Sequence, residues 1–257
     1  MLICFFSDWR GKWAKLPRAD LYVCIGNMLP NHPLPITEAE NDWEAFYKAK
    51  ICPRHETYRQ GKYIRGLLSR RSLLGNPEAP IVLVRGNRDF VSLSKMFGGE
   101  VYEIGTSATI FHLGIRGQEL RIGGFRGVSV DMGVWSDELQ DEDLSKLVSG
   151  LPQELDILVT HSPAYGMMDH VSGYGGRPQR WGIKPLTNYL EDQLLVNGPL
   201  RVHAFGYVPS CFGYIHRDVG GRKDITHLNV ATGFQLMEWD GTDVKVKEIK
   251  RNAIEFG

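Results

Sequence analysis

Several residues with reactive or ligating side chains directly follow short apolar stretches of the sequence. A carboxylate, an amide and an imidazole stand at three such positions, in Asp8, Asn87 and His161. These three kinds of group can ligate divalent transition metals. Arg10 and Arg88 stand beside two of them, and a guanidinium can grip a phosphate with two parallel hydrogen bonds. Residues of these types at the ends of apolar stretches indicate a functional site.

The apolar stretches themselves predict the strands that would position these residues. Each has three to five residues and ends in a polar or glycine-containing cluster, which is typical of strands covered on both faces in layered α/β architectures. Polar residues at the carboxyl ends of such strands are where open α/β sheets place their sites. These predicted strands are 2–6, 21–25, 81–84, 157–159 and 202–205.

Other segments predict hairpins, helices and one functional loop. The predicted hairpin strands are 109–115, 120–123, 225–230, 234–239 and 244–249, with turns at 116–117 and 240–241. Helices are predicted from Thr37 onward, where acidic residues fill the early turns, and over 56–74, 136–147 and 185–195. The stretch 164–181 is rich in glycine and aromatic residues, which favours an ordered functional loop.

Composition excludes several classes of protein. The chain has 257 residues, with 30 Lys and Arg against 30 Asp and Glu, so its net charge of 0 argues against an extended nucleic-acid footprint. No apolar run reaches the length of about 18 residues that a membrane span needs. The apolar N-terminus is too short for a signal peptide, and the four cysteines form no C-x-x-C pair. We therefore expect a cytoplasmic protein with free thiols and no membrane partner.

Five short motifs occur in a fixed order, each after an apolar strand. They are Ser7-Asp8-Trp9-Arg10, Gly26-Asn27, Gly86-Asn87-Arg88-Asp89, Thr160-His161-Ser162-Pro163 and Phe205-Gly206-Tyr207-Val208-Pro209. In this order they resemble the calcineurin-like metallophosphoesterase superfamily, whose pattern is D-x-H, G-D, G-N-H followed by D or E, a histidine after a strand, and G-H-x-H. The resemblance covers residues 3 to about 214. It implies one metallophosphoesterase-like domain over 1–257, an α/β fold built as a four-layer α-β-β-α sandwich of two facing mixed sheets flanked by helices.

The resemblance also implies a chemistry. Enzymes of this superfamily hold two divalent metals (Mn, Fe or Zn), which clamp a phosphoester and generate a metal-bound hydroxide. The aspartate of the G-D motif bridges both metals. The histidine of the G-N-H motif contacts the phosphate or the leaving group and is the catalytic histidine.

This sequence departs from that pattern at most of the positions that carry the chemistry. Three metal-ligand positions are retained, at Asp8, Asn87 and His161. Four are substituted, by Arg10, Asn27, Tyr207 and Pro209, and Asn27 stands where the bridging aspartate is expected. Arg88 stands at the position of the catalytic histidine, so no catalytic residue of the family is intact. The glycines and other scaffold residues of the motifs remain.

The substituted residues are poor metal ligands. An arginine has no lone pair to give, a proline has no side-chain donor, and a tyrosine ligates only as phenolate. Neutral amides do little to offset the dehydration of a divalent cation. We therefore expect no metal cofactor, and at most one weakly held ion near Asp8, Asn87 and His161.

The leading interpretation is a pseudoenzyme: a catalytically inactive or severely impaired metallophosphoesterase-like protein with a dismantled two-metal centre. Arg10, Arg88 and Arg177 are candidates for binding a phosphate-containing small molecule or a nucleotide. The alternative is an active metal-dependent phosphoesterase or phosphodiesterase with reassigned ligands, and a third possibility is a structural protein with no ligand. Simpler roles are also expected: Arg10 pairing with Asp8, Arg88 pairing with Asp89 or Asp8, and Tyr207 packing as an aromatic residue.

Overall fold

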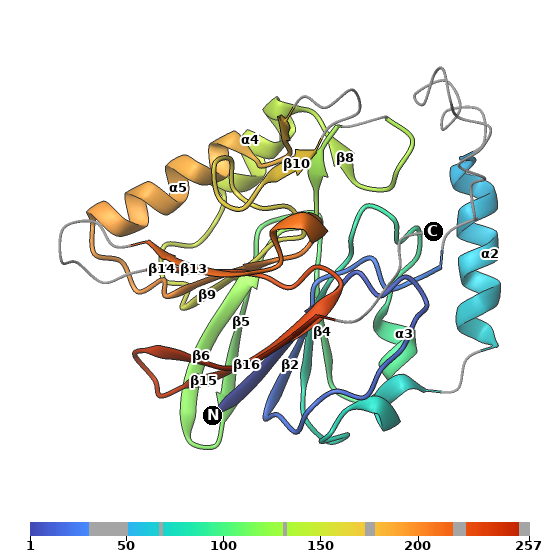
Figure 1. Cartoon of the computed structure of the whole chain (residues 1–257), viewed down its shortest axis with the longest axis horizontal. Helices are drawn as coiled ribbons and strands as arrows, with labels where there is room; N and C mark the ends of the chain where they lie inside the picture. The colour runs from blue at the N-terminus through green and yellow to red at the C-terminus, as the bar shows by residue number, and fades with distance from the viewer. Residues whose placement is uncertain (31–50, 67–68, 131–132, 173–177, 218–224, 252–257) are drawn as a thin grey trace.

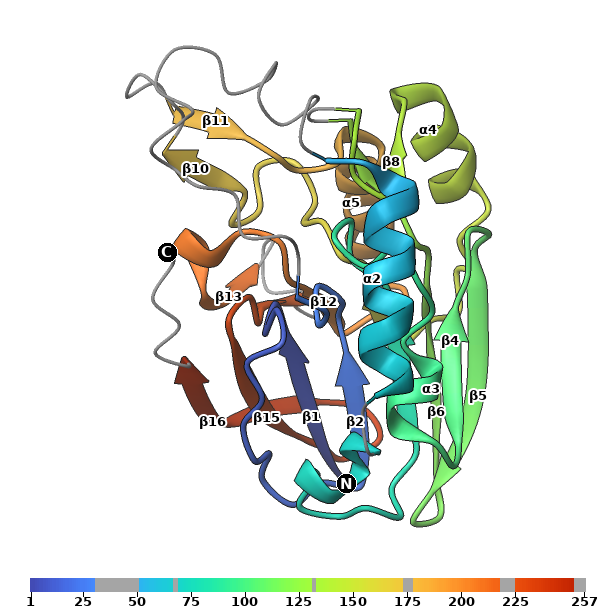
Figure 2. The same cartoon turned by 90° about the vertical axis from the view of Figure 1, so that its right-hand side faces the viewer.

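Two six-stranded mixed β-sheets face each other, and helices cover their outer faces (Figures 1 and 2). The computed structural model describes residues 1–30, 51–66, 69–130, 133–172, 178–217 and 225–251. The helix predicted from Thr37 lies outside these residues. The arrangement confirms the expected α/β fold with two mixed sheets between helical layers.

The first sheet carries the strands from the two ends of the chain. Its order is β16-β15-β1-β2-β3-β4, in which β1 to β4 are parallel and β15 and β16 are antiparallel additions at one edge. The strands are β1 (Leu2–Ser7), β2 (Leu21–Cys24), β3 (Ile81–Val84), β4 (Val101–Ile104), β15 (Gly233–Trp239) and β16 (Val244–Arg251).

The second sheet has the order β13-β14-β12-β9-β6-β5, with parallel strands at its centre and an antiparallel strand at each edge. The strands are β5 (Thr109–Ile115), β6 (Gln118–Gly124), β9 (Ile157–Val159), β12 (Val202–Phe205), β13 (Gly213–Arg217) and β14 (Ile225–Asn229). Two short pairs lie outside both sheets: β7 (Val128–Ser129) with β8 (Glu138–Leu139), and β10 (His170–Ser172) with β11 (Pro178–Arg180).

The strand β1 shows how the layers are held together. Its side chains alternate between the two faces of the sheet, as the period of a strand requires. Ile3 and Phe5 enter the core between the two sheets, where they meet apolar residues of the second sheet such as Ile122. Cys4 and Phe6 enter the core beneath the outer helices. All five side chains are fully buried, so both faces of this strand are stabilised by the hydrophobic effect.

The outer helices follow local signals in the sequence. Helix α2 (Pro53–Arg65) starts with proline, whose fixed φ suits a first turn, and packs with α3 (Ser94–Phe97) over the first sheet. Helices α4 (Asp141–Ser149) and α5 (Lys184–Leu195) cover the second sheet. The acidic first turn of α4 suits the positive end of the helix dipole.

Two predicted helices differ from the observed ones. The segment predicted as one helix over 56–74 divides into α2 and the short 3-10 helix η2 (Arg70–Leu73), because α2 ends at its cap residue Gly66. The helix predicted over 136–147 starts later, at Asp141. Asp137 has a φ of 58°, which an α-helix does not accommodate, so the chain turns before α4 begins.

The segment 164–181, predicted to be an ordered loop, contains the β10–β11 hairpin, and its residues 173–177 lie outside the described part. Asp169 is almost fully buried and accepts hydrogen bonds from the backbone N–H of Gly166 and from the Arg180 guanidinium, which fix the base of this hairpin. In the described part of the chain, no helix combines the length and the apolar character needed to cross a membrane.

Candidate functional site

The predicted site residues meet where the carboxyl ends of the parallel strands of both sheets come together. Asp8 follows β1, Asn27 follows β2 and Asn87 follows β3, all from the first sheet. His161 follows β9 and Tyr207 follows β12, both from the second sheet. All five residues are at least nine-tenths buried. We call these five residues the strand-end cluster.

Asn27 lies at the centre of the strand-end cluster. Its Nδ2 donates one hydrogen bond of 3.0 Å to Oδ1 of Asp8 and another of 3.2 Å to Oδ1 of Asn87. Its Oδ1 accepts a hydrogen bond of 2.8 Å from the backbone N–H of Arg88. That backbone donor fixes which end of the amide is oxygen, so the NH₂ group must face Asp8 and Asn87.

The carboxylate of Asp8 is surrounded by donors. Besides the Asn27 amide, the Arg10 guanidinium lies 4.0 Å from Oδ1, which confirms the expected pairing of Arg10 with Asp8. Its Oδ2 accepts hydrogen bonds from Oγ of Ser7 at 2.6 Å and from the backbone N–H of Tyr207 at 3.1 Å. Ser7 and the Tyr207 backbone were not predicted as partners, although Ser7 adjoins Asp8 in the sequence.

The cluster depends on unusual backbone conformations. Asp8, Arg10, Asn27 and Tyr207 all have left-handed φ values, of 60°, 45°, 54° and 70°. Such values are uncommon outside glycine and concentrate at functional sites. Gly86 is required for a different reason: a Cβ there would lie 2.3 Å from Oδ1 of Asn27 and 2.6 Å from Nε2 of His161.

His161 connects the two sheets. Its Nδ1 lies 2.6 Å from the carbonyl oxygen of Ile25, and because a carbonyl only accepts, Nδ1 must carry the proton. Its Nε2 is buried and has no hydrogen-bond partner among the described residues. Burial lowers the pKa of His161, Arg10 and Arg88 lower it further, and Asp8 raises it. The ring is therefore neutral at pH 7, with a free lone pair on Nε2.

Asp89 fixes the loops that carry Asn27 and Asn87. Its carboxylate accepts four backbone N–H groups, from Asn27, Met28, Leu29 and Gly86, at 2.5 to 3.1 Å. Burial raises the pKa of Asp89 to about 6, against the opposing effect of these donors. Asp89 thus positions the cluster indirectly, through its hydrogen bonds to the backbone of the loops that carry Asn27 and Asn87.

The side chain of Tyr207 and the other predicted residues make separate contacts. The Arg88 guanidinium lies over the ring of Trp135, 4.4 Å from its centroid. Tyr207 packs as expected, with ring centroids 5.4 Å from both His161 and Trp181. Pro209 begins the short helix η4 (Pro209–Cys211), and its carbonyl accepts a hydrogen bond from Arg251. Arg177 lies outside the described residues.

The dinuclear centre that the resemblance implies would draw on oxygens of the strand-end cluster. The oxygens of Asp8, Asn27 and Asn87 already accept hydrogen bonds from protein donors. A pair of divalent cations would need the same oxygens and would have to break those bonds. Within the described residues, no group of three or more His, Cys, Asp or Glu side chains is placed to hold a metal ion. The residues present do not fit two metals.

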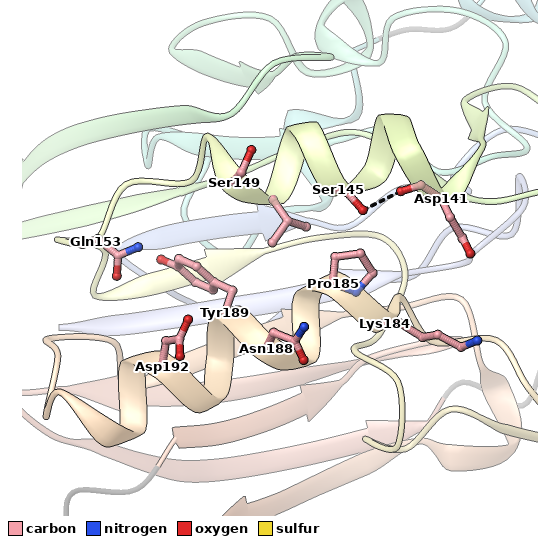
Figure 3. A pocket seen from close by; sticks show the side chains of 10 residues that line it. Asp141, Ser145, Ser149, Gln153, Lys184, Pro185, Asn188, Tyr189 and Asp192 are labelled. Carbon is pink, nitrogen blue, oxygen red and sulfur yellow. Dashed lines mark hydrogen bonds between the residues drawn. The ribbon is translucent and has the colours of Figure 1, made fainter.

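One cavity adjoins the cluster, and another lies apart from it. A pocket of about 270 Å³ adjoins it and is lined by Tyr207 together with Tyr165, Arg180 and Trp181. A separate groove of about 560 Å³ runs between α4 and α5, where Ser145 donates to the carbonyl of Asp141 (Figure 3). Asp141 and Asp192 lie toward opposite ends of this groove, so its carboxylates do not converge on one point (Figure 3).

Comparison with known proteins gives a likeness in fold to solved structures. No family model matches the sequence, and a search of curated proteins found no match. Among solved structures, a 5'-nucleotidase precursor from Thermus thermophilus aligns with a TM-score of 0.42 and 10% sequence identity. The alignment covers 97% of this chain and 53% of that one, so the chain spans about half the length of the structure it matches.

Proposed function

We propose that this protein is a metallophosphoesterase-like pseudoenzyme that binds a phosphate-type anion without hydrolysing it efficiently. The observation that carries the proposal is the position of the Asn27 amide. Its NH₂ group donates to Asp8 and Asn87, two of the three retained ligand positions. Hydrogen bonds from one neutral amide thus satisfy acceptors that a dinuclear enzyme would turn toward its cations.

Two arginines beside the cluster offer contacts for an anion. At pH 7, Asp8 and the buried Asp89 contribute two negative charges, and Arg10 and Arg88 contribute two positive charges. The Arg10 guanidinium lies 4.0 Å from Asp8, and the backbone N–H of Arg88 donates to Asn27, so both residues adjoin the cluster. The Arg10 side chain is 28% exposed, so it reaches from the buried Asp8 toward solvent. The two guanidinium groups, and not a net charge, suit a phosphate group, which arginine binds through paired hydrogen bonds.

The same residues offer little catalytic power. Uncatalysed hydrolysis of phosphate monoesters is among the slowest reactions that enzymes accelerate, by factors that reach about 10²¹. One general base contributes only about 10²- to 10⁴-fold, and burial makes the imidazole of His161 a weaker base than usual. Guanidinium groups stay protonated and generate no hydroxide at neutral pH. We therefore expect severely impaired turnover at most.

An activity assay with a gain-of-function control tests the proposal. The wild type is incubated with Mn²⁺ and a chromogenic phosphodiester, and we expect no chelator-sensitive hydrolysis. The control carries Arg10→His, Asn27→Asp, Arg88→His, Tyr207→His and Pro209→His together, and we expect it to hydrolyse the same substrate. Chelator-sensitive hydrolysis by the wild type would instead support an active enzyme with reassigned ligands.

A further inference from the structure

The strand-end cluster contains one buried hydrogen-bond acceptor that the described part of the protein leaves unused. Nε2 of His161 has no partner there, and the residue is fully buried. The tautomer follows from geometry, since Nδ1 donates to the carbonyl of Ile25. Buried polar groups in folded proteins are nearly always hydrogen-bonded, so this acceptor in a candidate site is available to a donor group of a ligand.

The neighbours of this nitrogen do not supply that donor. The Asn27 amide turns its NH₂ group toward Asp8 and Asn87. The atom of Asn27 that lies with Nε2 against Gly86 is Oδ1, which is another acceptor. A ligand that hydrogen-bonds to this nitrogen must therefore bring its own proton.

The charges nearby restrict the ligand further. Arg10 and Arg88 attract an anion, whereas the carboxylates of Asp8 and Asp89 repel one and already accept their own hydrogen bonds. An anion that keeps one O–H group meets both conditions. Its charged oxygens face the arginines, and its hydroxyl donates to Nε2.

We propose that the cluster selects tetrahedral oxyanions that retain a hydroxyl group, namely inorganic phosphate and singly protonated phosphate monoesters, over sulfate and phosphodiesters. His161 is the residue that determines this specificity, as an acceptor for the P–O–H group. The inference rests on the proposed anion-binding function and adds to it the class of anion. Sulfate has the same tetrahedral shape and size, but it carries no proton near pH 7, so its oxygens would face the Nε2 lone pair.

Calorimetric titration of the full-length protein with four anions tests this inference. The probes are inorganic phosphate, sulfate, methyl phosphate and dimethyl phosphate, at constant pH and ionic strength. We expect inorganic phosphate to bind about 10-fold more tightly than sulfate, the size of effect typical of one hydrogen bond gained and one repulsion avoided. Methyl phosphate should likewise bind more tightly than dimethyl phosphate, which has no hydroxyl group.

A matched pair of variants assigns the selectivity to His161. In His161→Ala, the ratio of phosphate to sulfate affinity should fall to about 1, because the acceptor that distinguishes these two tetrahedral anions is removed. His112→Ala removes an exposed histidine of β5 and should keep the wild-type ratio. Should His161→Ala fail to fold, ¹⁵N NMR of the wild-type histidines gives the answer, since phosphate but not sulfate should shift one Nε2 resonance.

The possible outcomes distinguish this inference from the proposed anion-binding function on which it rests. Equal affinity of the wild type for phosphate and sulfate would overturn the selectivity and leave anion binding standing. Retention of the wild-type ratio in His161→Ala would remove His161 from the role. Absence of binding by every probe would overturn the proposed anion-binding function itself, and the selectivity with it.

Discussion

The side-chain amide of Asn27 donates a hydrogen bond of 3.0 Å to the carboxylate of Asp8, across the carboxyl ends of two adjacent parallel strands. The same NH₂ group reaches Asn87 on the third strand. One neutral side chain therefore joins three strand ends that would otherwise bring acceptor oxygens together. The stability of the site then depends on hydrogen bonds within the protein.

Removal of this amide should destabilise the protein. In Asn27→Ala, Asp8 and Asn87 lose a buried donor, and we expect the free energy of unfolding to fall by about 1–3 kcal/mol. Asn27 also has a left-handed φ, which alanine tolerates less well than asparagine. Asn197→Ala is the matched control, because Asn197 has a φ of 51° and is exposed. If urea denaturation shows that both variants lose the same free energy of unfolding, the loss in Asn27→Ala comes from backbone strain and not from the missing amide.

A carboxylate at position 27 should make the stability of the protein depend on a bound cation. In Asn27→Asp, a second buried negative charge faces Asp8, and we expect the melting temperature to fall by several degrees in the presence of EDTA. Added Mn²⁺ should recover much of that loss in Asn27→Asp and leave the wild type unchanged. Asn188→Asp adds the same charge at an exposed position of α5 and should not respond to Mn²⁺. An equal response of the wild type would contradict the account.

The carboxylate of Asp89 should matter more for stability than any exposed acid. Asp89→Asn replaces one acceptor oxygen by an NH₂ group that faces backbone donors, and four N–H groups depend on that carboxylate. We expect the free energy of unfolding to fall by at least about 2 kcal/mol. Glu119→Gln, an exposed substitution on β6, should change it by less than about 0.5 kcal/mol. Similar denaturation midpoints for both variants would refute this role.

Two buried histidines should make the protein sensitive to acid. Burial lowers the pKa of His203, and His227 lowers it further, while burial also lowers the pKa of His161. Histidines in the unfolded chain have a pKa of about 6.5. Below that pH the unfolded chain therefore binds more protons than the native protein, and the free energy of unfolding decreases. Asp89 has the opposite effect. Its native pKa of about 6 exceeds its unfolded value, so protonation between pH 6 and 4 favours the native state.

We therefore expect a net loss of stability between pH 7 and 5, since two histidines oppose one carboxylate. His203 also has a specific partner, as its Nε2 lies 2.9 Å from Oγ1 of Thr160. His203→Gln keeps a donor for that contact but does not titrate, so its melting temperature should fall less over this pH range. His112→Gln, at an exposed position, should follow the wild type. Identical pH profiles for His203→Gln and the wild type would remove His203 from this explanation.

The sequence was most informative about the buried strands. The predicted bounds 81–84, 157–159, 202–205 and 109–115 match β3, β9, β12 and β5. In the first three, every residue is buried, so an unbroken apolar run marks the strand. The edge strands β4 and β13 were missed, because Val101–Ile104 and Gly213–Arg217 mix polar and apolar residues.

The sequence predicted which residues form the site, but it did not predict the hydrogen bonds among them. Each motif residue stands at the end of a strand, and parallel strands of both sheets bring those ends together. The direction of the Asn27 amide depends on the backbone N–H of Arg88, which is 61 residues away. The bond from the Tyr207 backbone to Asp8 joins residues 199 apart and two different sheets. Local sequence patterns carry no signal for such contacts.

Metal content measured together with thermal stability tests the central claim most directly. The protein is equilibrated with excess Mn²⁺, passed through a desalting column and analysed by inductively coupled plasma mass spectrometry, and its melting temperature is recorded with and without EDTA. Our account predicts far less than one ion per chain and a melting temperature that EDTA leaves unchanged. Two tightly held ions per chain, with a melting temperature that drops by several degrees in EDTA, would contradict it.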